Sequence, residues 1–259
     1  NPYSCYPGAL PYVLSVTAFC RDFMPGSYTN YGPGCKIAAP GGEIIGTSDV
    51  SGMILSTGVS NAATQSPAVE NNGKHDYNYV YMQGTSMACP HVSGVAALGI
   101  AYAKKLGKKF TREEFTSMLL TSVNDIDSYL PDGSKYKGQL GAGAVDAWKF
   151  LMAIEGTPSV MVQTGKKVSI DLSPYCNPRN ISEVQVGAVD ALVLGINSTP
   201  EIKDGILEIE CTKTGAGKIL ICSRVGKDPE MSDGIGDMNY YCEISIVSRP
   251  YVSENGGWL

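Results

Sequence analysis

The sequence is poor in histidine and has no run of basic residues. Its 259 residues include 2 histidines, and its 20 Lys and Arg residues are fewer than its 25 Asp and Glu residues. Nucleic-acid-binding surfaces are built from clustered Lys and Arg, so we predict that nucleic acid is not a partner. The scarcity of histidine, together with the lack of any C-x-x-C pair among the 8 cysteines, argues against a zinc site.

We also expect no secretion leader in these residues. The chain opens with Asn1-Pro2-Tyr3, without a Met, a basic start or an apolar segment, so we expect an internal part of a longer precursor. The longest helical candidate contains Pro90 and Gly94, and we predict that no apolar run is long enough to span a membrane.

The cysteines show no pattern that fixes a pairing. Most lie within apolar runs, as do Cys222 after Ile-Leu-Ile and Cys242 between Tyr-Tyr and Glu-Ile. Small buried thiols are the preferred interpretation, and one or two disulfides remain the alternative.

The first half of the chain predicts strands packed against helices. Residues 12–19 are rich in β-branched and aromatic side chains and indicate a strand that is buried on both faces, as in a parallel sheet. A second strand is predicted over residues 36–39, and it ends at Pro40-Gly41-Gly42. Residues 57–79 are polar and predict a surface loop.

Three helices are predicted after this loop. Residues 86–106 have apolar groups on all sides for four turns, so we expect a buried helix. Thr111-Arg-Glu-Glu114 has the sequence of a capping box and starts the second helix. The third is predicted over residues 144–154, after a loop over residues 124–142.

Beyond Gly156 the pattern becomes that of short alternating strands, and we predict an all-β, Ig-like sandwich of about 100 residues. The domain boundaries are therefore placed at residues 1–155 and 157–259, with no helical period in the second domain. An acidic, glycine-rich segment over residues 228–237 indicates a hairpin loop, with a calcium loop as the alternative. The strands are predicted at residues 160–162, 168–172, 184–186, 207–211, 218–224 and 240–247.

The segment from Gly84 to Gly94 has the features of a reactive site. Gly84 permits a close approach of backbone and ligand, and Ser86 follows at the expected start of a helix. Unpaired N–H groups and the positive end of the helix dipole favour a developing oxyanion there. Pro90 is expected to be tolerated because it falls in the first turn. A serine that only caps the helix is the competing interpretation.

These eleven residues, GTSMACPHVSG, resemble the nucleophile motif of the subtilisin-like serine peptidases, G-T-S-M-A-x-P-H-V-x-G, at every defined position. The resemblance implies that Ser86 is the catalytic nucleophile and that Gly84 and Thr85 contact the substrate. Tyr6-Pro7-Gly8 resembles the family's segment that lines the specificity pocket, so Tyr6, Pro7 and Gly8 are also substrate-binding candidates.

The resemblance continues over residues 6–154. Residues 27–33 and 37–41 are similar to the family's S-x-x-G-P and A-P-G stretch, and residues 141–147 resemble the start of its closing helix. It implies the C-terminal half of a three-layer α/β domain with a parallel sheet.

The family's Asp and His motifs, of the types D-[ST]-G and H-G-T-H, do not occur in these 259 residues. His91 follows Ser86 by five residues on one helix, which places it about 140° round and about 7.5 Å along the axis, so it cannot be the base. His75 lies in the predicted polar loop and is expected to be solvated. Asn1 stands where the family's oxyanion Asn precedes Tyr-Pro-Gly, but at a shorter distance, and is interpreted mainly as the start of the chain.

The resemblance therefore implies a serine endopeptidase present as its nucleophile-bearing fragment, inactive alone. It would act on a peptide or protein through an acyl-enzyme and would need no cofactor or metal. The missing N-terminal half of the same precursor is the expected partner, and the protein is expected to be secreted or on the surface of a bacterial cell. The alternative is an inactive, protease-like binding or scaffolding protein with an adhesive β-sandwich.

Overall fold

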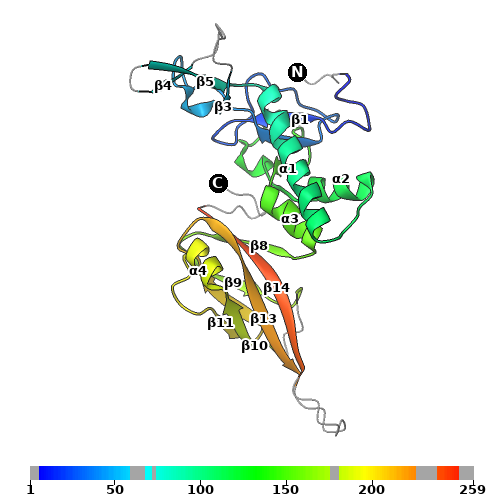
Figure 1. The fold of residues 1–259 in the computed structure, drawn as a ribbon, viewed down its shortest axis with the longest axis vertical. Coiled ribbons are helices and arrows are strands. Elements are labelled where there is room, and N and C mark those ends of the chain that lie inside the picture. The colour runs from blue at the N-terminus through cyan, green and yellow to red at the C-terminus, as the bar shows by residue number, and fades with distance from the viewer. Residues whose placement is uncertain (1–5, 59–67, 72–73, 176–180, 226–237, 251–259) are drawn as a thin grey trace. The chain divides into compact units, whose positions relative to one another are not determined.

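The computed structural model describes residues 6–58, 68–71, 74–175, 181–225 and 238–250, drawn in colour in Figure 1. The chain divides into two compact units, Asn1–Phe150 and Leu151–Leu259. The division falls within helix α3 (Ala147–Glu155).

The first unit is organised on a four-stranded sheet with the order β1-β2-β7-β6. Strand β1 (Val16–Phe19) pairs in parallel with β2 (Ile37–Pro40), and both strands are largely buried, which confirms the predicted parallel pair. Strand β2 pairs in parallel with β7 (Ala144–Val145), which pairs antiparallel with β6 (Val123–Asn124).

Strand β1 is shorter than the predicted strand over residues 12–19. The segment before it forms turns, because Leu10 N–H donates to the carbonyl of Pro7 (3.1 Å) and Val13 N–H donates to that of Leu10 (3.0 Å). These local hydrogen bonds compete with strand pairing.

Helix α1 (Thr85–Lys105) packs against β1 and β2. Our prediction that it is buried all round is wrong: Ala88, Val92, Gly99 and Ala103 are buried, whereas Leu98 and Ile100 are 48% and 60% exposed. Only the face that meets the sheet is covered within the described residues. By length and composition α1 could cross a membrane, contrary to our prediction, although the core helix of a water-soluble protein passes the same test.

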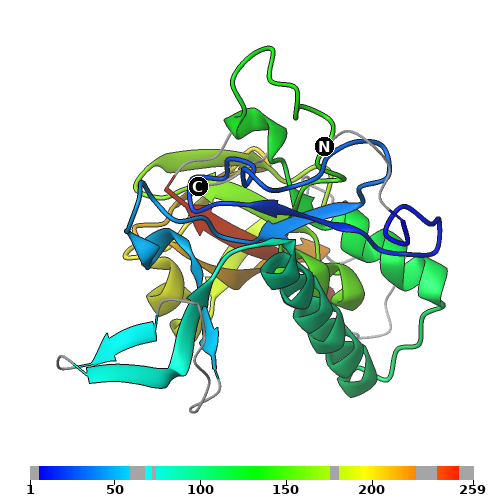
Figure 2. The same ribbon diagram turned by 90° about the horizontal axis from the view of Figure 1, so that it is seen from above.

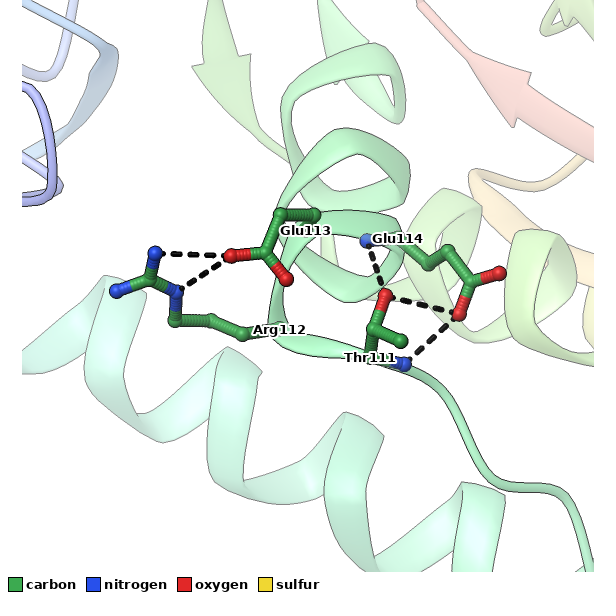
Figure 3. Close-up of polar contacts among 4 residues, drawn as sticks. All are labelled: Thr111, Arg112, Glu113 and Glu114. Carbon is green, nitrogen blue, oxygen red and sulfur yellow. Dashed lines mark hydrogen bonds and ion pairs between the residues drawn. The ribbon is translucent and has the colours of Figure 1, made fainter.

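Helix α2 (Arg112–Thr121) begins with the predicted capping box, shown in Figure 3. Glu114 N–H donates to Thr111 Oγ1 (3.2 Å), and Thr111 N–H donates to the Glu114 carboxylate (2.8 Å). The ring of Phe115 packs edge-on against that of Phe150 in α3, with centroids 5.0 Å apart. This local signal is confirmed.

The segment after α2 contains β6, a 3₁₀ turn over Asp127–Tyr129, β7 and α3. We predicted a helix over residues 144–154, but it begins at Ala147 because Ala144 and Val145 extend the sheet as β7. The buried Asp146 accepts a hydrogen bond from the N–H of Lys149 (2.9 Å) and so fixes the first turn of α3.

Apart from residue 58, the described residues within 57–79 lie in strands and not in the surface loop that we predicted. A 3₁₀ turn over Val50–Gly52 leads into β3 (Ile54–Thr57), and β3 and β4 (Ala68–Asn71) both pair antiparallel with β5 (Lys74–Met82). This small sheet projects from the rest of the first unit in both Figure 1 and Figure 2. The end of β5 lies three residues before α1.

The second unit contains two sheets. One has the order β10-β13-β14-β8 and the other β11-β12-β9. Every strand that we predicted in this half is present, and β11 is an addition. The bounds are β8 Ser159–Gln163, β9 Lys167–Asp171, β10 Ile181–Val186, β11 Glu201–Lys203, β12 Ile206–Glu210, β13 Gly215–Val225 and β14 Met238–Arg249.

A single apolar core joins the two sheets of the second unit. It includes Ile170 and Leu207 from one sheet and Ile219 and Ile244 from the other. Helix α4 (Ala188–Leu194) contributes Leu194 to this core, so the prediction that the second half has no helix is wrong. Val189, Leu192 and Val193 of α4 are exposed. Because apolar residues occur on both the buried and the exposed sides of α4, its sequence shows no amphipathic helical period.

Candidate active site

Ser86 is the second residue of α1 and is exposed. Gly84 caps the helix with φ 143° and ψ 163°, a conformation that a side chain would disfavour. The carbonyl of Gly84 accepts a hydrogen bond from Met87 N–H (2.9 Å), which closes the first turn around Ser86. The serine therefore stands among the first N–H groups of a long helix, where the backbone can stabilise negative charge.

The turn that carries Ser86 is held to the sheet by main-chain atoms. Gly84 N–H donates to the carbonyl of Gly41 (3.0 Å), and Gly41 N–H donates to that of Phe19 at the end of β1 (2.9 Å). A Cβ atom on Gly41 would lie 2.5 Å from Ala18 Cβ and 2.9 Å from the oxygen of Gly84. Only glycine fits at position 41 without a shift of its neighbours.

Tyr28 supports the same turn. Its hydroxyl donates to the carbonyl of Gly42, and it lies within 2.7 Å of where a Cβ of Gly41 would be. Burial raises the pKa of Tyr28 to about 12, so the hydroxyl remains a donor at physiological pH.

We predicted that Pro90 falls in the first turn of α1, but it is the sixth residue of that helix and lies beyond the first turn. Proline has no N–H, so the carbonyl of Ser86 lacks the usual donor four residues later.

A cleft of about 770 Å³ opens beside Ser86. Tyr6, Pro7 and Gly8 line it together with Thr85 and Ser86, so the structure brings five of the six predicted site residues to one cavity. Gly84 does not line the cleft, and its role is to shape the turn that places Ser86 at the start of α1. The other lining residues are Ala9, Val13, Leu14, Ser15, Val16, Thr17, Asn30, Tyr31, Gly32, Pro33, Gly34, Cys35, Cys89, Pro90 and Ser93.

His91 is not placed to accept a proton from Ser86. The exposed His91 donates from Nδ1 to the carbonyl of Met87 (2.8 Å), one turn back along α1. The backbone of His75 lies in strand β5, opposite Glu70 of β4, and not in a loop as we predicted. Five helical steps separate His91 from Ser86, which directs the two side chains apart.

Two cysteines of the cleft were missed from the sequence. Cys89 is exposed and follows Ser86 by three residues, so both lie on one face of α1. Cys35 is half-buried, and burial raises its pKa. The helical spacing of Ser86 and Cys89 could have revealed the first. The described cysteines Cys20, Cys35, Cys89, Cys211 and Cys242 are free thiols. Cys211 is buried, as the preferred interpretation expects, but Cys20, Cys35 and Cys242 are half-buried and Cys89 is exposed, so that interpretation holds only in part.

The described residues contain no group of three His, Cys, Asp or Glu side chains that could hold a metal ion. The acidic segment over residues 228–237 and the terminal Asn1 lie outside them.

The model of the subtilase family matches residues 3–146, more than half of the chain. The chain is 34% identical over 151 residues to an extracellular basic protease of Dichelobacter nodosus, covering 58% of this chain and 21% of that protein. It is 33% identical over 130 residues to a cell wall-associated protease of Bacillus subtilis, covering 50% and 11%. The chain thus spans about a fifth or less of these relatives.

Among solved structures, a lanthipeptide protease is similar, with 27% identity and a TM-score of 0.47 over 57% of this chain and 43% of that one. The match over residues 3–146 includes the α1 turn and the cleft beside it, and the α/β unit built on β1 and β2 has the subtilisin-like fold. The chain belongs to the subtilase family.

Proposed function

We propose that this chain is the nucleophile-bearing part of a serine endopeptidase. In this mechanism Ser86 Oγ attacks the carbonyl carbon of a peptide bond, the amine leaves, and water then hydrolyses the acyl-enzyme. The N–H of Ser86 donates to the oxyanion that forms in each step. Tyr6, Pro7, Gly8 and Thr85 bind the substrate, and Gly84 shapes the turn. No cofactor takes part.

One observation carries this proposal: Ser86 is exposed at the start of α1 and opens into a cleft lined by Tyr6, Pro7 and Gly8. These segments lie about 80 residues apart in the sequence, and both fall within the family match. A serine that only capped the helix would need no cleft beside it.

We further propose that the base comes from outside these 259 residues. His91 is bonded to Met87, and a base must reach the serine hydroxyl at about 2.6–3.2 Å. The N-terminal half of the same precursor, carrying the Asp and His motifs, is the expected source. Because loss of a triad member costs several orders of magnitude in rate, the chain alone is expected to be almost inactive.

A fluorophosphonate probe tests the role of Ser86. The chain should label slowly alone and about 10³-fold faster when joined to, or mixed with, the N-terminal part of the precursor. Ser86→Ala should abolish both the labelling and casein hydrolysis, whereas Ser93→Ala, which also faces the cleft, should leave both intact. Rapid labelling of the chain by itself would contradict the need for a second half, and labelling of Ser86→Ala would contradict the assignment of the nucleophile.

Two finer proposals concern the rest of the chain. Residues 157–259 form an accessory Ig-like β-sandwich appended to a catalytic part over residues 1–155. The shared core of two sheets supports this, with Leu207 and Ile244 fully buried. The protein acts outside the bacterial cell or at its surface, which the extracellular and cell-wall relatives support. Limited proteolysis between the two parts and cell fractionation test these statements.

An inactive binding protein is the second candidate. The observation that favours it is the outer face of α4, where Val189 and Leu192 are 73% and 68% exposed. If the complete precursor neither labels at Ser86 nor cleaves casein, this candidate replaces the protease.

A further inference from the structure

Tyr31 connects the cleft to a loop far along the chain. Its side chain is among those that line the cleft, and its ring meets the ring of Tyr136 edge-on, with centroids 4.7 Å apart at 70°. Both rings pack against the buried core of the first unit, which includes Leu130 and Leu140 at either end of the loop that carries Tyr136. One wall of the cleft is therefore built on the 131–140 loop.

Hydrogen bonds fix this loop beside the cleft. Gly32 N–H, one residue after Tyr31, donates to the carbonyl of Gln139 (2.8 Å). Gly138 N–H donates to the carboxylate of Asp127 (2.7 Å). The loop is thus held both to the cleft wall and to the 3₁₀ turn before it, so side chains at its tip have a defined place.

Lys135 stands at that tip, over both aromatic rings. Its ammonium nitrogen lies 5.5 Å from the centroid of Tyr31 and 5.0 Å from that of Tyr136. The side chain is exposed, and none of the ion pairs between described residues involves it. Lys137 of the same loop pairs with Asp132 at 3.6 Å instead. An ammonium held by ring faces keeps N–H donors for a carboxylate.

The lining of the cleft carries no charge of its own. All of its lining residues within the described part of the chain have uncharged side chains, most of them apolar. Lys135 therefore places a positive charge within 5.5 Å of the centre of a lining ring, beside a surface that offers no carboxylate to neutralise it.

We infer that Lys135 is a specificity-determining residue, which binds the carboxylate of an Asp or Glu side chain of a polypeptide that crosses Tyr31. The inference rests on the proposed function, because it takes the cleft to be the substrate site. A substrate with an apolar residue in the cleft and an acidic residue at the Tyr31 edge fits this surface best.

A binding assay with the Ser86→Ala chain tests the inference without hydrolysis. The probes are fluorescein-labelled ten-residue peptides with one central Phe and Ala at the other positions. In each peptide one Ala is replaced by Glu, or by Gln in its matched partner, and the set covers every Ala position. At one position, or at two adjacent ones, the Glu peptide should bind about two- to fivefold more tightly than the Gln peptide by fluorescence anisotropy, and salt should weaken this preference.

Matched variants identify the residue responsible. Lys135→Met, which keeps most of the apolar stem, should remove the preference for Glu, and Lys135→Arg should retain it. Lys137→Met in the same loop is the control and should also retain it. Equal affinity for Glu and Gln peptides, no binding of any peptide, or an unchanged preference in Lys135→Met overturns the inference. Failure of Ser86 to react with the probe, with the preference for Glu intact, counts against the proposed catalysis alone.

Discussion

Residues 1–150 and residues 151–259 bury their apolar side chains in different ways. In the second unit, strands from two sheets direct Leu207, Ile219 and Ile244 into one core, and each is almost fully buried. In the first unit, only one face of helix α1 is buried by other described residues. Leu98 and Ile100 on the remaining surface of α1 are exposed. The sheets of the second unit bury their apolar side chains in a shared core, and its short helix α4 leaves Val189 and Leu192 exposed, whereas the long helix that bears the nucleophile has a whole apolar face exposed.

The contrast shows what an apolar sequence does and does not indicate. Residues 86–106 and the strands of the second unit are both rich in apolar side chains. Composition gives the tendency to be buried, but partners in space decide which side chains are buried. Four predictions test this comparison, beginning with the largest expected effect.

Leu207→Ala should destabilise the protein most. The side chain is fully buried at the centre of the second core, so its truncation removes apolar contacts and leaves a cavity, at a cost of about 2–5 kcal/mol. The matched substitution Ile100→Ala, on the exposed face of α1, should change the free energy of unfolding by less than about 0.5 kcal/mol. Urea denaturation measures both. Equal losses for the two variants would break the comparison.

Gly41→Ala should disturb the first unit where its stability depends on close backbone contact. The new Cβ would meet Ala18 at 2.5 Å, so the strand end or the turn at Gly84 must move, at a cost of about 1–3 kcal/mol. Because this turn carries Ser86, labelling of Ser86 in the complemented protein should also slow. Gly46→Ala is the control: nothing lies within 4 Å of its new Cβ, and its positive φ of 63°, which Gly41 does not share, tests backbone strain without a clash. Equal labelling rates in the two variants would contradict this prediction.

Thr111→Ala should cost about 1 kcal/mol, because it removes the side-chain half of the capping box of α2. The effect is smaller than loss of a core residue since the cap is exposed and the backbone bond from Thr111 to Glu114 remains. Ser117→Ala, at an exposed position of the same helix, should be close to neutral. Thermal unfolding followed by circular dichroism compares the two, and a destabilisation by Ser117→Ala as large as that by Thr111→Ala would remove the cap as the explanation.

Lys218→Met should have the smallest effect, about 0.5–1 kcal/mol, despite two short ion pairs in the second unit. Burial opposes the charge of Lys218, but its bonds to Glu155 (2.6 Å) and Glu243 (2.8 Å) outweigh burial and raise its pKa. The contribution of Lys218 to the free energy of unfolding is therefore complete below about pH 10, the usual range of the lysine pKa. It is lost as pH rises through the raised pKa of Lys218 in the folded protein.

The stability difference between wild type and Lys218→Met should consequently be constant from neutral pH to about pH 10 and shrink above it. Lys166 is exposed, and Lys166→Met is the control for replacing a surface lysine by methionine. A difference larger than that for Leu207→Ala would show that ion pairs and not apolar packing hold the second unit together.

Features encoded by near neighbours were predictable from the sequence. The capping box depends on Thr111 and Glu114, three residues apart, and the turn at Ser86 depends on an eleven-residue motif. The strands of the second unit alternate apolar and polar side chains, which is a pattern of period two. Each of these signals lies within about a dozen residues of chain.

Features that depend on distant partners were missed. The sheet formed by β3, β4 and β5 has polar residues in the sequence, such as Asn71 and Lys74, which mask the pairing of its strands. The exposed face of α1 depends on what packs against it and not on its own period. Lys135 and Tyr31 are separated by about a hundred residues, so only the folded chain brings the charge to the cleft.

The hydrogen bond between Gly84 and Gly41 has a consequence for sequence drift and for the design of variant libraries. Donor and acceptor are main-chain groups, which every residue except proline provides in full, so this link depends on no side-chain chemistry. The requirement for a particular residue type applies to Gly41, which has no room for a Cβ, and to Gly84, which has a positive φ. A library that fixes Gly41 and Gly84 should keep far more members with a reactive Ser86 than one that varies these two glycines, when both libraries keep the buried side chains of β2.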